Sequence, residues 1–316
     1  MTDKQAHHTA VNSYDQNHSD YHTYRPEFTP VIVNPLLVEL NLATKDVNGD
    51  HIFDTSKKIV EIAAGTGKFT KNLVANGWTD NLTIIEPSTG MLESFKRNFP
   101  NIKAVQASSY AIPIEDSSVD AVIIAQGFHW FADADSLKEI SRVLKPNGKL
   151  GLIWNFDDTS PSQDSPAAES KFYDAGSRYF NTTDFKGNNQ DVFKQFFANQ
   201  KWNQEVTQYI YGFDVNVPQY RHGKWRQIFK NDSYFKNGIL DSFAMYDLEI
   251  EKQNVWKYWE TRSYITDLGD EEKQKIKLHV EKLIEAYQQD NSFSDNNKTR
   301  LIKPMGTHTA VLTVNK

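Results

Sequence analysis

Cysteine is missing from all 316 positions of the chain, and its absence excludes several kinds of chemistry. Without thiols there is no disulfide, no thiolate metal ligand and no cysteine nucleophile. An excess of positive charge is missing too, because 35 Lys and Arg stand against 41 Asp and Glu, for a net charge of −6. Partners of a nucleic-acid backbone usually present a basic face. The composition therefore argues against nucleic acid as a partner.

Long apolar runs and targeting signals are also lacking. No apolar stretch reaches the ~18 residues that a membrane helix needs. The polar N-terminal segment, MTDKQAHHTAVNSYDQ, has neither an apolar secretory core nor an Arg-rich mitochondrial pattern. No cluster of His, Asp or Glu has metal-ligand spacing. We therefore expect a cytoplasmic protein without a membrane partner or a metal, and the oligomeric state stays open.

What the chain does contain is a regular alternation of short apolar runs and helical patterns. Strands are predicted at 58–63, 82–86, 102–106, 121–126 and 149–154, with helices at 69–76, 88–98 and 136–144 between them and one more from Pro30. Alternation with short connections predicts an α/β fold with a doubly wound, mostly parallel sheet.

The alternation ends at Asn155. Beyond it, we predict a mainly helical cap inserted after the fifth strand, then strands at 243–249 and 307–314 and helices at 253–266 and 271–288. A last strand that returns to the sheet would make the cap an insertion. The expected divisions are an N-terminal lid and first helix (1–44), a core (45–157), the cap or acceptor insertion (158–235) and a return to the core (236–316).

The segment VEIAAGTGKFT, residues 60–70, is close to two phosphate-binding loops and completes neither. A dinucleotide fingerprint needs Gly at Thr70, and a P-loop needs Gly at Ile62 and Ser or Thr at Phe69. Glu61 would also repel a pyrophosphate. A phosphate ligand is therefore disfavoured.

A ligand with a cationic end and a ribose suits the same segment better. Glu61 would attract an amine or a sulfonium. Glu86 ends the second strand, 21 residues after Gly65, where a carboxylate can accept both ribose hydroxyls. Ribose with a positive, phosphate-free tail describes S-adenosylmethionine.

With these motifs the chain resembles the class I S-adenosylmethionine-dependent methyltransferases, in their small-molecule branch (methyltransferase type 11). VEIAAGTGKFT looks like motif I, and IIEPSTGML (84–92) looks like the second-strand acid segment. AQGFHWFADADSLKEISRVLKPNGKLGLIWN (125–155) looks like the fourth and fifth strands with their connection. Thr261-Arg-Ser263 is similar to a Thr-x-Ser of trans-aconitate methyltransferase-like yeast enzymes. The resemblance implies a Rossmann-like sheet and S-adenosylmethionine as the cofactor.

The resemblance also implies roles for matching residues. Met91 would pack on the adenine, although it could equally be core, and the family often has an acid where this chain has serines. Tyr14 and Tyr21 lie in a segment that could close over the cofactor as a lid. The expected cofactor-binding residues are Tyr14, Glu61, Gly65, Gly67, Glu86, Met91, Ser108, Ser109 and Gln126.

Methyl transfer needs a base only when the acceptor atom carries a proton. His129 follows the fourth strand, and it is either such a base or a side chain that fixes its loop by a hydrogen bond. Arg25 and Arg262 could clamp an anionic acceptor, with a structural ion pair as the alternative for Arg262. Trp130 would form a wall of the acceptor pocket.

The sequence thus predicts an S-adenosylmethionine-dependent methyltransferase of a small molecule, with a carboxylate or hydroxyl oxygen as the acceptor. Two alternatives are a nicotinamide-dependent oxidoreductase on the same sheet and a non-catalytic S-adenosylmethionine-binding protein. A macromolecular acceptor is disfavoured by the pI near 5.9 and by the inserted cap.

Overall fold

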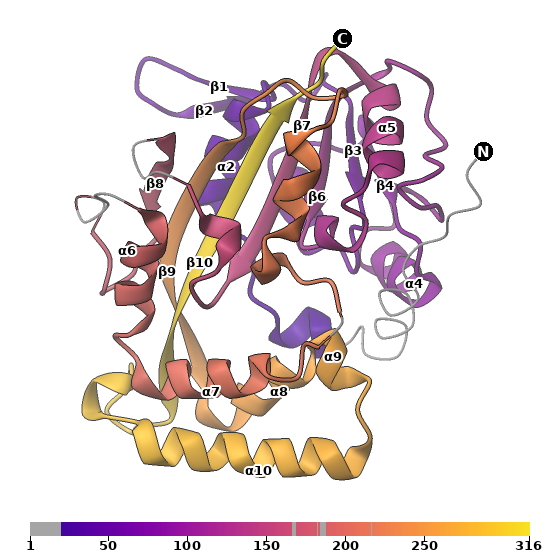
Figure 1. Ribbon diagram of the computed structural model, residues 1–316. Coiled ribbons are helices and arrows are strands. Elements are labelled where there is room, and N and C mark those ends of the chain that lie inside the picture. The colour runs from indigo at the N-terminus through magenta and orange to yellow at the C-terminus, as the bar shows by residue number, and fades with distance from the viewer. Residues whose placement is uncertain (1–19, 166–168, 182, 184–187, 216) are drawn as a thin grey trace.

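A sheet of eight strands, in the order β5-β4-β3-β6-β7-β10-β9-β8, runs through the centre of the protein (Figure 1). The computed structural model describes residues 20–165, 169–181, 183, 188–215 and 217–316. The strands are β3 (Ile59–Ile62), β4 (Leu82–Ile85), β5 (Lys103–Val105), β6 (Val119–Ala125), β7 (Leu144–Phe156), β8 (Lys171–Asp174), β9 (Leu240–Glu251) and β10 (Arg300–Thr313).

The first five strands of this sheet, β3 to β7, pair in parallel, and β10 is antiparallel to both of its neighbours. The predicted mostly parallel, doubly wound sheet is therefore confirmed. The predicted closing strand is confirmed as β10, which enters the sheet beside β7. A separate hairpin pairs β1 (Ala43–Lys45) with β2 (His51–Phe53).

Helices cover both faces of the sheet. Residues 20–24 are helical, and further α-helices follow along the chain. They are α2 (Pro30–Glu39), α3 (Thr70–Ala75), α4 (Thr89–Asn98), α5 (Ala134–Val143), α6 (Asn189–Phe197), α7 (Lys201–Tyr211), α8 (Val255–Glu260), α9 (Ser263–Thr266) and α10 (Asp270–Tyr287).

Alternate side chains of the central strands enter two different cores, as a sheet buried on both faces requires. From β6, Val122 and Ile124 pack with α5 and α6 on one face. Ala121 and Ile123 pack with α2, α3 and α4 on the other. The apolar runs in the sequence therefore reflect burial on two sides.

Local signals set several helix boundaries. The Ser88 hydroxyl caps α4 by accepting the Met91 N–H at 3.2 Å. The helix predicted from Ser136 begins two residues earlier, because Asp133 accepts the Ser136 N–H and acts as its N-cap. Asn147, near the start of β7 where the pairing with β6 has a register shift, has φ +62°, a left-handed conformation that Asn tolerates.

The region beyond β7 differs from the prediction in two respects. It is not wholly helical, since β8 lies within residues 158–235 and pairs in parallel with β9 at the edge of the sheet. The single helix predicted at 253–266 is wrong, because Thr261 and Arg262 separate α8 from α9.

One further hydrophobic cluster joins parts of the chain that the predicted division at residue 235 separates. Trp202 and Val206 of α7 pack with Trp259 of α8 and with Ile276 and Val280 of α10. These helices lie together at one end of β9 and β10 (Figure 1). The cap residues of α7 therefore share their core with the C-terminal part of the chain.

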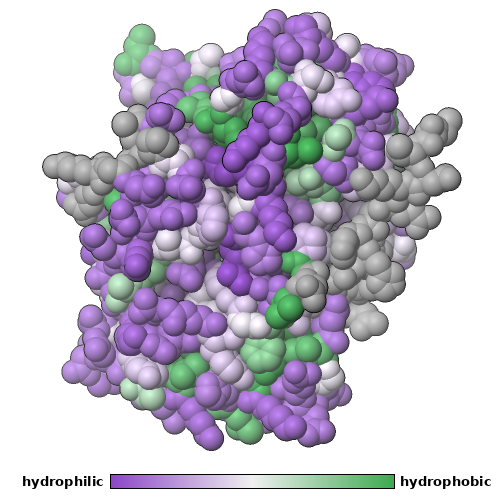
Figure 2. All heavy atoms as spheres, in the orientation of Figure 1, coloured by the Kyte–Doolittle hydropathy of each residue, from purple (hydrophilic) through white to green (hydrophobic). Residues whose placement is uncertain are grey.

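The outer surface in the view of Figure 2 is mostly hydrophilic, with smaller apolar areas between. Large exposed apolar side chains occur singly, as at Val47 and Leu278, which is normal for a folded domain. Among the described helices, none has both the length and the apolarity needed to cross a membrane. Within the described ranges, no group of three or more His, Asp or Glu side chains could hold a metal ion.

Candidate functional site

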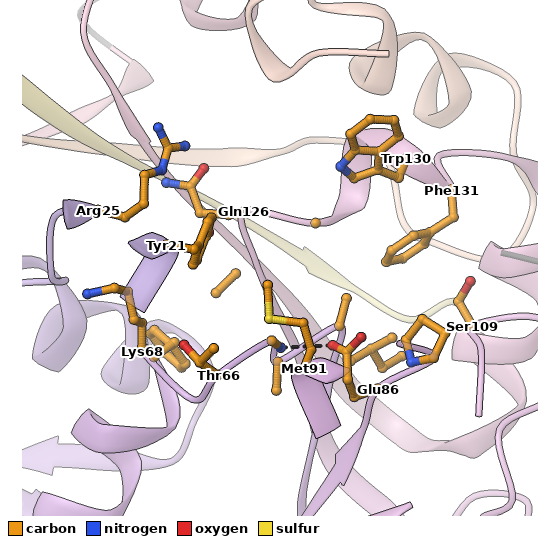
Figure 3. Close-up of a pocket in the computed structure, with 18 of the residues that line it drawn as sticks. Tyr21, Arg25, Thr66, Lys68, Glu86, Met91, Ser109, Gln126, Trp130 and Phe131 are labelled. Carbon is orange, nitrogen blue, oxygen red and sulfur yellow. Dashed lines mark hydrogen bonds between the residues drawn. The ribbon is translucent and has the colours of Figure 1, made fainter. Parts of the chain in front are cut away.

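The main pocket opens at the carboxyl ends of four parallel strands, where open α/β sheets bind ligands. Its walls come from the loops after β3, β4, β5 and β6 and from residues 21–28 (Figure 3). Of the predicted site residues, eight line this pocket: Arg25, Gly65, Glu86, Met91, Ser108, Ser109, Gln126 and Trp130. Its empty space of about 1030 Å³ includes open solvent, and is ample for a nucleoside-sized ligand.

The loop after β3 has an unusual backbone. Ala63, Gly65 and Gly67 have φ of +56°, +58° and +92°, and glycine adopts such angles at no steric cost. A Cβ at Gly67 would lie 2.3 Å from Cε2 of Phe99. Gly67 therefore shapes the loop without lining the pocket, while Gly65 lies in its wall.

Glu86 braces this loop from the next strand. Its Oε2 accepts the Gly65 N–H at 2.8 Å, and its Oε1 accepts the Ser88 N–H at 2.9 Å. Each carboxylate oxygen has a second lone pair, so Glu86 can hold the loop and still accept ribose hydroxyls. Only 5% of Glu86 is exposed, which favours strong hydrogen bonds.

Glu61 does not line the pocket, where a contact with the cationic end of the ligand was expected. It is a fully buried residue of β3. Its Oε2 accepts the Thr70 hydroxyl at 2.7 Å, and its Oε1 has no partner among the described residues. Burial raises the pKa of Glu61, and the nearby charge of Glu86 acts in the same direction. The hydrogen bond from Thr70 opposes both effects, and the resulting pKa is about 8.

Charge is unevenly distributed around the pocket. Lys68 and Arg25 lie toward one end with Tyr21, and Glu86 and Ser109 lie toward the other, with Met91 between (Figure 3). A ligand with an amino-acid end and a ribose end suits this polarity, so the residues present fit S-adenosylmethionine. Sequence reasoning missed Lys68, which follows the Gly-rich turn directly. Tyr14 lies outside the described residues.

A second, more polar pocket adjoins the first. Tyr21, Arg25 and Gln126 line both pockets. The second pocket is otherwise lined by His129, Asn155, Phe156, Asp157, Asp158, Tyr211, Gln219, Tyr220, Arg221, Arg262 and Ser263. The predicted acceptor residue Trp130 lies in the first pocket, whereas Arg262 and His129 meet in the second.

His129 lies in the short 3-10 helix Phe128–Trp130 after β6. Burial, together with the nearby charges of His222, Arg262 and Arg25, lowers the pKa of His129 to about 3. The ring is therefore neutral at neutral pH. Its Nδ1 is buried without a partner among the described residues, and His129 itself lines the second pocket.

Arg262 is held by a buried polar cluster. Its Nη2 donates to Asp157 Oδ2 at 2.6 Å and to the Tyr258 hydroxyl at 3.1 Å. Lys303 Nζ lies 3.4 Å from the same Asp157 oxygen. Burial alone would raise the pKa of Asp157, but the two cations and the hydrogen bonds of Tyr211 and Tyr258 hold it well below its usual range. The ion pair considered as the alternative role of Arg262 is thus present, and its partner Asp157 lines the same second pocket.

Arg25 has a different environment. Its guanidinium lies 5.5 Å from the Tyr21 ring centre and 5.6 Å from the Tyr258 ring centre. In the described part of the chain no carboxylate lies within ion-pair distance of it. Arg25 therefore brings positive charge to the boundary between the two pockets.

Comparisons with known proteins agree with this geometry. A family model described as a methyltransferase domain matches residues 60–152. A methyltransferase-like protein of Schizosaccharomyces pombe, described as uncharacterized, is 29% identical over 266 residues, which are 84% of this chain and 83% of that protein. A second S. pombe methyltransferase is 41% identical over 142 residues, which are 45% of this chain and 52% of that one.

A solved structure from Anaeromyxobacter dehalogenans, described as a candidate type II methyltransferase, is similar in fold. It has a TM-score of 0.52 and 12% identity, over 92% of this chain and 97% of that one. At this identity the likeness supports the fold alone. The sequence matches, by contrast, favour methyl transfer over the nicotinamide-dependent alternative.

Proposed function

We propose that this chain, a class I S-adenosylmethionine-dependent methyltransferase, methylates a carboxylate oxygen of a small-molecule acid. The cofactor would supply an electrophilic methyl group on a sulfonium. As the acceptor oxygen bonds to this methyl group in line, the methyl–sulfur bond would break and S-adenosylhomocysteine would leave. The protein then has to align the two reactants and to balance charge. The observation that carries this proposal is Arg25 at the boundary of the two pockets, whose guanidinium has no carboxylate partner among the described residues.

The second pocket is suited to an anion. Arg25, Arg221 and Arg262 line it together with Asp157 and Asp158. Arg221 is paired with Asp214 at 2.5 Å, and Arg262 with Asp157 at 2.6 Å. Arg25 is the member of this group that has a free guanidinium fork among the described residues, and such a fork matches a carboxylate bidentately.

The low pKa of His129 also favours a carboxylate as the acceptor. A base with a pKa of about 3 accepts a proton from a hydroxyl poorly at neutral pH. A carboxylate is already ionised there and needs no base. Neutral His129 can instead donate or accept one hydrogen bond to orient the acceptor.

Alignment is the remaining contribution of the protein. Gln126 has φ +62° and follows β6 at the point where the two pockets meet. Its Nε2 lies 3.5 Å from the Asn155 backbone oxygen. Holding two reactants in line contributes on the order of 7–11 kcal/mol to lowering the barrier.

An acceptor screen tests the proposal. Purified protein is incubated with S-adenosylmethionine carrying a labelled methyl group and with matched acids, alcohols, phenols and amines, and products are identified by mass spectrometry. We expect labelled methyl esters, which mild alkali hydrolyses with release of methanol. A label that is stable to alkali, on nitrogen, carbon or an ether oxygen, would exclude a carboxylate acceptor. Cofactor binding with no turnover across the panel would favour a non-catalytic binding protein.

A further inference from the structure

Lys68 is a buried cation in the cofactor pocket to which the reaction described above assigns no part. Its side chain is 9% exposed, and it lines the pocket next to Thr66 (Figure 3). Burial lowers the pKa of Lys68, against the opposing effect of Glu27. A lysine in such a place is normally retained with a partner.

The partner is Glu27, which comes from another part of the chain. Lys68 Nζ lies 3.3 Å from Glu27 Oε1, and Lys71 Nζ lies 3.4 Å from Glu27 Oε2. The Glu27 side chain is 48% exposed and that of Lys71 is 66% exposed. Glu27 is thus a half-exposed carboxylate shared between a pocket lysine and a surface lysine.

The segment that carries Glu27 is fixed to the sheet and reaches both pockets. Asn155 Nδ2 lies 3.4 Å from the Pro26 oxygen and 3.3 Å from the Glu27 oxygen. Two residues before Glu27 stands Arg25, which lines both pockets. The carboxylate of Glu27 is therefore presented to Lys68 from a positioned backbone.

We propose that Lys68 binds the α-carboxylate of the cofactor and that Glu27 takes the place of this carboxylate when the cofactor is absent. Lys68 lies at the end of the pocket opposite Glu86, the expected ribose ligand (Figure 3). A carboxylate that arrives there replaces one charge-assisted contact of Lys68 by another. Glu27 keeps Lys71 and water, so its release costs little. This inference rests on the cofactor and is independent of the acceptor class.

Calorimetry with two ligands isolates this contact. S-Adenosylhomocysteine has the α-carboxylate, whereas 5′-methylthioadenosine has the same nucleoside and a sulfur but no amino-acid end. Lys68→Met should weaken S-adenosylhomocysteine roughly 10- to 100-fold, the range for a hydrogen bond to a charged group. The affinity for methylthioadenosine should stay within about twofold of that of the wild type, since the contact is absent there. An equal loss for both ligands would overturn the assignment of Lys68.

Lys71→Met is the matched control, because Lys71 contacts the same Glu27 carboxylate from outside the pocket lining. It removes the same charge from the first turn of α3, close to Lys68, and we expect no selective loss of S-adenosylhomocysteine. A loss as large as that of Lys68→Met would mean that the ligand is attracted by the positive electrostatic potential around both lysines and not by a direct contact with Lys68.

Glu27→Gln tests the second half of the proposal. Removing the competing carboxylate should tighten S-adenosylhomocysteine roughly two- to fivefold, the scale of a solvent-exposed ion pair, and should leave methylthioadenosine unchanged. The gain should vanish in the Lys68→Met background. Unchanged or weaker binding would overturn the competition. Because Glu27 is half exposed, this variant decides the question even if Lys68→Met does not fold.

Discussion

The Thr70 hydroxyl donates to Glu61 Oε2 over 2.7 Å, while Glu61 Oε1 is buried with no partner among the described residues. A carboxylate in such a place is stable only when it is protonated or compensated. The pKa of about 8 for Glu61 means that this carboxyl group is protonated at neutral pH. Glu61, whose charge was expected to repel a phosphate, is therefore neutral in the folded chain below about pH 8 and does not line the pocket.

Glu61→Gln should make the stability of the ligand-free protein less sensitive to pH. Between the ordinary pKa of 4.5 and the folded value of about 8, Glu61 is protonated in the folded chain and ionised in the unfolded one. Raising the pH through this window therefore favours unfolding, by at most about 1.4 kcal/mol per unit. Urea unfolding of both proteins at pH 5 and pH 8.5 measures the effect. If the difference between variant and wild type stays constant, Glu61 does not titrate in this window.

Glu86→Gln should weaken the binding of S-adenosylhomocysteine. The amide has one acceptor oxygen, so it cannot accept from both Gly65 and Ser88, and its NH₂ group would face an N–H. We expect a loss of roughly 10- to 100-fold, corresponding to about 1.5–3 kcal/mol for a hydrogen bond to a charged group. Calorimetry checks this loss, with exposed Glu93→Gln on α4 as the control. Equal affinity of the two variants would remove Glu86 from the site.

The core of the fold could be read from the sequence because its signals are local. Strands β3, β4 and β6 are short apolar runs, and Ser88 caps α4 within three residues of its partner. β8 could not be found in this way. Its four residues, KFYD, have exposed or half-buried side chains, and it is a strand only because it pairs with β9, which is distant in the chain.

The candidate site also contains some residues that local sequence signals predict and others that they do not. Gly65 and Glu86 follow from a turn and a strand end, and both line the pocket. The cluster around Asp157 was not predicted, since Asp157 and Arg262 are 105 positions apart. Lys68 was not predicted as a site residue, because the residues around it do not complete the P-loop pattern. Its ion pair with Glu27 joins residues 41 positions apart, which only the folded chain brings together.

His129→Gln should leave the pH dependence of the reaction unchanged. With a pKa of about 3, His129 is neutral from pH 5.5 to 8.5 and contributes no ionisation to the rate in that range. We expect kcat to fall by no more than about tenfold, the scale of one orienting hydrogen bond. Steady-state kinetics of both proteins across this range gives the answer. A rate that rises near pH 6.5 in the wild type and not in the variant would identify His129 as a base.

Arg25→Gln should raise the KM for the acceptor more than it alters the affinity for the cofactor. Arg25 lines both pockets, but the first pocket also contains Lys68, whereas the other arginines of the second pocket are already paired. Losing a bidentate contact to a carboxylate should raise KM roughly 10- to 100-fold. Arg25→Lys keeps the charge without the fork and should recover only part of the loss. Exposed Arg97→Gln on α4 controls for net charge. If Arg25→Gln instead weakens S-adenosylhomocysteine in calorimetry and leaves the acceptor KM unchanged, Arg25 binds the cofactor and not the proposed acceptor.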